Sequence, residues 1–235
     1  MSGKVFFLTT VSLSALVLCV SASPAANRFP VTHIRSEVHR AISAMPGAVT
    51  LYDQNSDDSG VAVLSTNFTH DFDSFDSYGA DDFAVPRGHK WKIREVEAAG
   101  VYAQNSNPAQ SENVLFYRDA MGLPGSLVAE CDGLPGIDND GSFAVKIPKS
   151  CRATLKGGLK YWISVVANEN NACCTEWAWE TRSGQLGRAA AWENPGSGFR
   201  RGCPEWGVMT SCVGSYGEGP DFMFTLKGKD IKLLT

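Results

Sequence analysis

The chain has 235 residues and carries 21 Lys and Arg against 25 Asp and Glu, a formal net charge of −4. This length suits one domain with a hydrophobic core, and the lack of a basic run argues against nucleic acid or an anionic membrane as partner. After residue 22, no apolar stretch of the sequence reaches the roughly 20 residues that a membrane span needs. We therefore expect no membrane span.

Residues 1–22 have the pattern of a secretory signal peptide. Lys4 gives a positive start, an apolar run follows, and small residues precede a cleavage site after Ala22. A membrane anchor would need a longer apolar run, and a lipid-modified Cys19 would need a small residue in place of Leu18. The pattern predicts a secreted, extracellular protein.

Six cysteines follow the predicted signal peptide: Cys131, Cys151, Cys173, Cys174, Cys203 and Cys212. An even number in an exported chain favours disulfide bonds. We favour the pairings between sequence neighbours, which are Cys131 with Cys151 and Cys203 with Cys212. The adjacent Cys173 and Cys174 could bond to each other, stay reduced or pair elsewhere. A zinc site is the weaker alternative, because two C-x-x-C pairs are lacking and the histidines are distant in sequence.

Residues 23–47 form a lead-in to the domain. Apolar residues recur at near-helical spacing over residues 31–44, and Pro46 and Gly47 would end a helix there. The segment fits a short amphipathic helix, a pro-segment or a tether. We expect a helical or irregular lead-in.

Residues 48–78 are polar and acidic, with short strands expected over residues 49–52 and 60–64. Asp53, Asn55 and Asp57 place side-chain oxygens at alternate positions, as at the start of a calcium loop. The spacing of an EF-hand fails, so a solvated turn is the alternative that we favour.

A second acidic cluster follows and is expected to lie at the surface, with calcium as its alternative role; it comprises Asp71, Asp73, Asp76, Asp81 and Asp82. Asn67 begins an N-glycosylation triplet, which matters only in a host that glycosylates.

From residue 83 on, short alternating segments separated by turn residues predict strands. They cover residues 83–85, 91–103, 114–117, 127–131, 143–147, 153–155, 161–167, 175–181, 189–192 and 221–226. A change of phase at Glu95-Val96 predicts a bulge. Residues 118–125 and 132–141 are expected to be a turn and a loop.

Residues 161–182 look like a central hairpin of a β-sandwich. The first strand is apolar except for Ser164, so we expect it to be buried on both faces. In the second, Glu176, Ala178 and Glu180 alternate with Trp177 and Trp179, which predicts one solvated face and one apolar face.

No nucleophile motif is present, and nothing pairs a serine with a histidine. We therefore expect a non-catalytic protein. A hydrolase that uses two carboxylates is the least favoured alternative, because the sequence does not show a pair held at the separation such enzymes need.

The six tryptophans suggest carbohydrate binding, because exposed Trp and Tyr side chains can stack on the apolar face of a sugar ring. Core packing is the alternative, and we expect about half of the tryptophans to be buried. Trp192 and Trp206 lie in Gly/Pro-rich segments and are the better candidates for exposure. Trp177, Trp179 and Arg182 are further candidate ligand contacts.

An ordered series of landmarks resembles a β-sandwich module of secreted and cell-surface proteins, mostly bacterial, that has no established activity. The landmarks are LYDQ (51–54), ADDFAVP (80–86), NVLFYRDAMGLPG (113–125), YWISVVAN (161–168), EWAWETR (176–182), AWENPGSGF (191–199), GCPEW (202–206) and PDFMF (220–224). The resemblance implies the fold over residues 49–226 and two local disulfides among Cys131, Cys151, Cys203 and Cys212. The adjacent Cys173 and Cys174 depart from the pattern.

These observations predict an all-β protein, with a signal peptide (1–22), a lead-in (23–47) and one antiparallel, jelly-roll-like β-sandwich (48–235). We expect a secreted module that binds a glycan or a surface polymer through loop aromatics. The alternative is a structural matrix or surface protein. We expect no cofactor, with calcium as the one ion that the acidic segment would suit.

Overall fold

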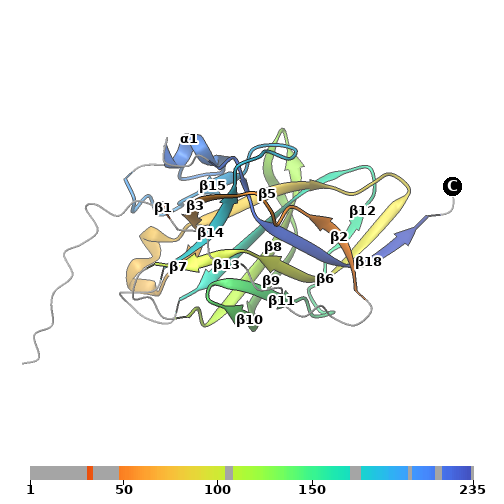
Figure 1. Ribbon diagram of the computed structural model, residues 1–235, viewed down its shortest axis with the longest axis horizontal. Coiled ribbons are helices and arrows are strands. Elements are labelled where there is room, and N and C mark those ends of the chain that lie inside the picture. The colour runs from red at the N-terminus through yellow and green to blue at the C-terminus, as the bar shows by residue number, and fades with distance from the viewer. Residues whose placement is uncertain are drawn as a thin grey trace, which may run out of the picture.

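The computed structural model describes residues 31–33, 48–103, 108–169, 176–200, 203–214 and 219–233, and these form three β-sheets (Figure 1). Sheet A contains β1 (Val31–His33), β3 (Asp58–Leu64), β7 (Gly100–Tyr102), β14 (Trp177–Arg182) and β17 (Asp221–Phe222). Sheet B contains β2 (Val49–Asp53), β6 (His89–Ala98), β10 (Gly136–Asn139), β11 (Ser142–Lys146), β12 (Thr154–Lys156) and β18 (Phe224–Lys232). Sheet C contains β4 (Thr66–Asn67), β5 (Tyr78–Ala84), β8 (Ser111–Ala120), β9 (Leu123–Leu134), β13 (Lys160–Asn168), β15 (Ala191–Glu193) and β16 (Gly207–Val208).

The fold is an antiparallel β-sandwich, as the sequence predicts. Among the described strands, only the short contact of β4 with β13 is parallel. Helical structure in the described chain is limited to a 3₁₀ turn, η1 (His70–Phe75), and one short helix, α1 (Met209–Val213). None of the described helices is long and apolar enough to cross a membrane.

Sheets A and B join into one layer of the sandwich. β6 continues into β7 after Ala99, and β17 continues into β18 after Met223. At this junction Ala99 N donates to Met223 O (3.1 Å), Met223 N to Glu180 O (2.9 Å) and Glu180 N to Ala99 O (2.9 Å). Sheet C forms the second layer.

Aromatic side chains fill the space between the layers. Phe83 of sheet C lies with its ring centroid 6.3 Å from that of Trp91 and 6.5 Å from that of Phe224, both in sheet B. Trp179 stacks on Phe222 at 4.5 Å. Each such side chain, fully buried, stabilises the fold by about 1.5–3 kcal/mol, so the aromatic side chains contribute strongly to the packing of the two layers.

The expected central hairpin is wrong. β13 pairs with β5 and β8 in sheet C, whereas β14 pairs with β3, β7 and β17 in sheet A. β13 is buried along almost its whole length, as predicted. The pattern of apolar and polar residues predicts which residues are buried, but it does not identify the neighbouring strand. For this reason β13 and β14, which are adjacent in sequence, were assigned to one hairpin although they lie in opposite layers.

The turn expected over residues 118–125 and the loop expected over 132–141 are mostly strand. β8 and β9 are joined by a two-residue turn at Met121 (φ 56°) and Gly122 (φ 90°), and β10 and β11 by one at Asp140 (φ 52°) and Gly141 (φ 97°). Two positive φ values are typical of the tight hairpin turns that match strand twist. The Gly and Pro residues within both segments gave them the composition of loops.

The predicted bulge in β6 is confirmed. Ile93 pairs with Gly228 and Glu95 with Lys227, so Arg94 is the extra residue. The shift lets both Ile93 and Val96 point into the core, where neither is exposed.

The lead-in differs from its expectation where it is described. Val31–His33 forms β1 and pairs with β3, so a helix over residues 31–44 cannot include these three residues. The signal peptide, the rest of residues 23–47 and the pair Cys173 and Cys174 lie outside the described residues.

Candidate functional site

The structure contains two disulfides, Cys131–Cys151 and Cys203–Cys212, each with Cα atoms 5.4 Å apart. They are the two neighbour pairings that the sequence favours. The first connects β9 to the segment before β12, and the second closes the loop that leads into α1.

Three of the predicted ligand-binding tryptophans are core residues. Trp177, Trp179 and Trp192 are each 0% exposed. Their indole Nε1 atoms donate to backbone carbonyls, those of Gly141 (2.7 Å), Met223 (2.8 Å) and Leu64 (2.8 Å) respectively. The predicted exposure of Trp192 is therefore wrong. Its Gly/Pro-rich neighbourhood surrounds a short strand, β15, that lies between β5 and β16 inside sheet C.

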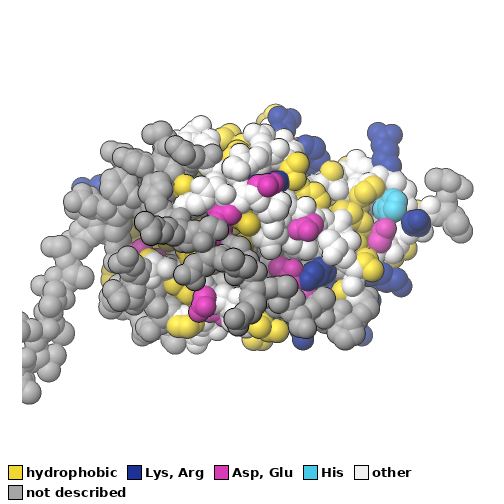
Figure 2. All heavy atoms as spheres, viewed as in Figure 1, with side chains coloured by type: hydrophobic (Ala, Val, Ile, Leu, Met, Phe, Trp, Pro, Cys, Tyr) yellow, Lys and Arg dark blue, Asp and Glu magenta, His cyan; other side chains and the backbone are white. Residues whose placement is uncertain are grey.

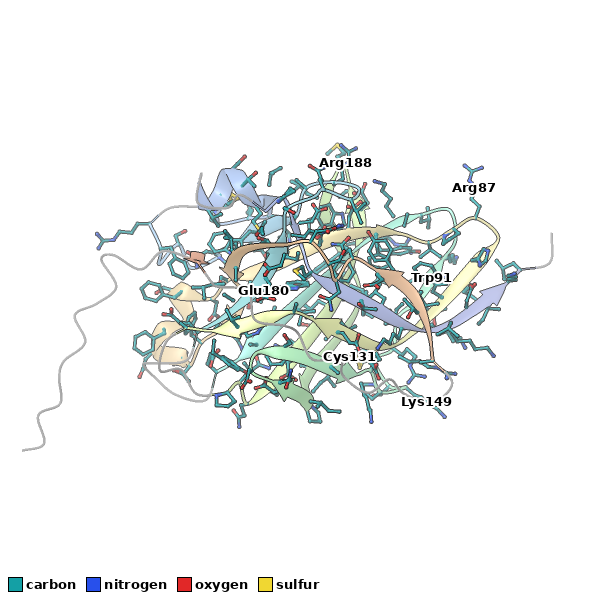
Figure 3. All side chains as sticks on the ribbon, in the orientation of Figure 1. Arg87, Trp91, Cys131, Lys149, Glu180 and Arg188 are labelled. Atoms are coloured by element: carbon teal, nitrogen blue, oxygen red, sulfur yellow. A yellow bond between two sulfur atoms is a disulfide. The ribbon has the colours of Figure 1, made fainter. Side chains whose placement is uncertain are left out.

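The face of β14 expected to be solvated is also buried. Glu180 is 2% exposed and Arg182 6% exposed. Burial, with a smaller effect of Asp58, raises the pKa of Glu180 to about 7. Figure 3 labels Glu180 on its strand, β14.

Two of the residues considered for calcium, Asp53 and Asp57, make contacts within the protein. Asp53 Oδ1 accepts hydrogen bonds from Asn55 N (3.0 Å) and Thr225 Oγ1 (2.9 Å), as in an Asx turn. Asp57 Oδ2 lies 2.9 Å from Arg182 Nη2. Within the described ranges, no group of three His, Cys, Asp or Glu is placed to hold a metal.

The second acidic cluster is partly interior, which corrects its expected surface position. Asp81 is 0% and Asp82 2% exposed. Asp81 Oδ2 accepts from Gln54 Nε2 and from Phe222 N, both at 2.7 Å, and its Oδ1 accepts from Asp82 N at 2.7 Å. Burial, reinforced by Asp221, raises the pKa of Asp81. This carboxyl connects β5 of sheet C to the other layer, so its role is structural.

The outer face of sheet C carries the remaining candidate site. In β5, Asp81 and Phe83 point between the layers, so Tyr78 points outward. Glu193 of β15 lies directly opposite Tyr78, and Tyr117 projects outward from β8. We call Tyr78, Tyr117, Glu130, Glu193, Glu205 and Trp206 the aromatic–acidic face.

A small second apolar cluster underlies this face. Ala80, Trp162 and Ala191 are fully buried on the outer side of the sheet, and the half-buried Tyr117, Leu123 and Trp206 pack over them. The rings of Tyr117 and Trp206 meet edge to face, with centroids 5.8 Å apart and planes at 70°. Trp206 therefore keeps part of its indole in solvent while the rest is fixed by packing.

The loop that carries Trp206 is held from several sides. The Cys203–Cys212 disulfide closes it, and Cys203 O accepts from Asn194 N at 2.7 Å. The backbone N–H of Trp206 lies close enough to the carboxyl group of Glu193 to favour its charged form. Gly207 passes so close to the disulfide that a Cβ there would lie 2.5 and 2.6 Å from the two sulfur atoms. Only glycine fits at this position without movement of the loop.

Burial and neighbouring carboxylates shape the electrostatics of the face. Burial, then Glu205, raises the pKa of Glu193 to about 7, although the backbone N–H of Trp206 opposes this shift. Burial, then nearby acids that include Asp76 and Glu193, raises the pKa of Tyr78 to about 12. Burial, Glu193 and Glu130 also raise the pKa of Tyr117. Both phenols therefore stay protonated at neutral pH and remain hydrogen-bond donors.

This arrangement suits a polyhydroxylated ligand. The indole and phenol rings offer surfaces for the apolar face of a sugar ring, and the carboxyl and hydroxyl groups beside them can bind sugar hydroxyls. Of the residues predicted to bind ligand, only Trp206 lies here. Tyr78, Tyr117 and Glu193 were missed, since strand alternation shows that residues share a face but not which strands bring them together.

Asn67, the predicted glycosylation site, lies in β4 and is half-buried. Its amide Nδ2 donates to Asn168 Oδ1 at 2.8 Å. Attachment of a glycan would use one of the two hydrogens of this amide nitrogen, so the other would have to make the hydrogen bond to Asn168.

Comparison of the chain with models of known protein families, with curated proteins and with solved structures found no match in any of the three.

Proposed function

We propose that the chain is a secreted, non-catalytic β-sandwich module that binds a glycan through its aromatic–acidic face. The observation that carries the proposal is the fixed pair of Tyr117 and Trp206, 5.8 Å apart, beside Glu193. A rigid, half-exposed aromatic pair next to hydrogen-bonding groups loses little conformational entropy when a sugar stacks on it.

Two further features support an extracellular setting. The signal-peptide pattern of residues 1–22 favours export, and two disulfides favour an oxidising compartment. The resemblance to a module of secreted and cell-surface proteins agrees with this setting. The polymers met there include cell-wall and matrix polysaccharides.

Calorimetric titration with a panel of soluble neutral polysaccharides tests the proposal. We expect Trp206→Ala to weaken binding by at least about tenfold, equal to ~1.4 kcal/mol, because a central aromatic anchor would be lost. Val49→Ala is the matched control: it trims an exposed apolar side chain of β2, in the opposite layer, and should leave affinity unchanged.

Two results would replace the proposed function with another one. If no polysaccharide binds, the structural alternative replaces the binding module. If a bound polysaccharide is shortened during incubation and Glu193→Gln stops this, a carboxylate hydrolase replaces it, because an acid of raised pKa beside a second carboxylate is the arrangement that glycosidases use.

A further inference from the structure

Four lysines project from one face of sheet B: Lys90 and Lys92 in β6, Lys156 in β12 and Lys229 in β18. The alternate residues of β6 and β12, Trp91 and Leu155, point into the core, so the lysines beside them point outward. Lys92, Lys156 and Lys229 are exposed, and Lys90 is half-exposed. We call these four residues the lysine face.

The strand register places these lysines directly beside one another. Lys92 is opposite Lys229, and Lys90 is opposite Lys156. Side chains at such positions have Cβ atoms about 4.5–5.5 Å apart, and like charges there are destabilising. Positions two apart along a strand are separated by roughly 6.6–6.8 Å. The fold thus holds four ammonium groups within a small area, against their mutual repulsion.

Acidic residues compensate neighbouring lysines but not these four. Lys227 contacts both Glu95 and Glu97, and Lys160 Nζ lies 3.2 Å from Asp82. Asp230 follows Lys229 in sequence but lies opposite Trp91, on the other side of the sheet, where it contacts His89 at 2.8 Å. In the part of the chain that the structure describes, no carboxylate forms an ion pair with any residue of the lysine face.

The surrounding surface is also basic. Figure 2 shows Lys and Arg side chains gathered at the end of the molecule where Figure 1 places β12 and the last residues of β18. Arg87 projects into solvent at the same end (Figure 3). This local positive charge stands against a chain whose formal net charge is −4, so an anionic partner would be attracted to this region in particular.

We propose that the lysine face binds a linear anionic polysaccharide that carries sulfate or carboxylate groups. The ammonium groups are spread over three adjacent strands, so a chain with repeated anionic groups can contact all four, whereas one small anion reaches only some of them. The outward residues between them include Thr154 and Ile231 but no aromatic side chain on which nucleic-acid bases could stack.

This inference is independent of the proposed glycan site, because it concerns the other layer of the sandwich. The aromatic–acidic face lies on sheet C and the lysine face on sheet B. If both sites operate, one molecule can hold a neutral and an anionic polymer at the same time and so connect them.

Titration of the full protein at pH 7 with heparin and with polygalacturonate tests the inference and separates sulfate from carboxylate recognition. We expect binding to at least one polymer, with affinity that falls as salt rises. The variant Lys92→Gln/Lys156→Gln/Lys229→Gln should lose at least tenfold in affinity. The control Arg118→Gln/Arg188→Gln/Arg200→Gln removes the same charge from exposed positions elsewhere and should lose less than twofold.

Several outcomes would overturn the inference. These are no binding to either polymer, an equal loss in both triple variants, or tighter binding to duplex DNA or to phosphatidylserine vesicles at the same salt concentration. Binding of neutral polysaccharide to the first variant should stay intact, which separates failure here from failure of the aromatic site.

Discussion

At the scale of single residues, environment and not type decides what each polar or aromatic side chain does. Trp192 and Trp206 both lie in Gly/Pro-rich sequence, yet one is core and the other half-exposed. The difference arises because β15 is enclosed by β5 and β16, whereas Trp206 precedes the edge strand β16. Sequence could predict that aromatic residues matter here but not which of them faces solvent.

Asp81 illustrates the same point and gives a test. Asp81→Ala would remove the acceptor of one N–H of Gln54 Nε2, whose other N–H stays bonded to Phe222 O, and of the backbone N–H groups of Phe222 and Asp82. Each unsatisfied buried group costs about 1–3 kcal/mol. We expect the free energy of unfolding in urea to fall by about 3 kcal/mol. Asp71→Ala, at an exposed position, should change it by less than about 0.5 kcal/mol. Equal small effects would show that Asp81 does not stabilise the fold.

At the scale of elements, alternation located most strands, including the bulge in β6, because burial has a period of two in a strand. It did not reveal the partners of a strand. β13 and β14 lie in different layers although they are neighbours in sequence. For the same reason the lysine face could not be seen: its members come from β6, β12 and β18, which the fold brings together from distant parts of the chain.

The loop closed by Cys203–Cys212 allows a prediction at this scale. Replacing both cysteines by serine should lower the free energy of unfolding by about 2–3 kcal/mol and also weaken glycan binding, because Trp206 would lose its support. Replacing Cys131 and Cys151 should lower stability to a similar degree but leave glycan affinity intact, since Cys131 points into the core from the inner side of sheet C and the aromatic–acidic face is on the outer side. Thermal unfolding measures the stability of both double variants, and calorimetric titration measures their affinity for the glycan. If the two variants bind the glycan with equal affinity, the loop closed by Cys203–Cys212 does not position Trp206.

At the scale of the whole molecule, folding buries several carboxyl groups away from water. Burial raises the pKa of Glu112, Glu180 and Glu193 to about 7 in each case. The folded protein therefore retains protons that the unfolded chain releases between its ordinary pKa of 4.5 and about 7. By linkage, this contribution to stability is complete below that range and is lost as pH rises through it.

We therefore expect the midpoint of thermal unfolding to be several degrees higher at pH 5 than at pH 8. The combined variant Glu112→Gln/Glu180→Gln/Glu193→Gln should show a smaller difference between the two pH values. Scanning calorimetry in buffers of equal ionic strength provides the comparison. A midpoint that rises from pH 5 to pH 8 would contradict the assigned pKa shifts.

The central claim is that Trp206 is a half-exposed anchor in an otherwise buried set of tryptophans. Collisional quenching of tryptophan fluorescence by iodide tests this claim most directly. The other five tryptophans are at most 4% exposed, so Trp206 should account for nearly all quenching, and Trp206→Phe should abolish it. A polysaccharide found to bind by calorimetry should protect Trp206 from iodide. Undiminished quenching at saturation with that polysaccharide would contradict the claim that this face is the binding site.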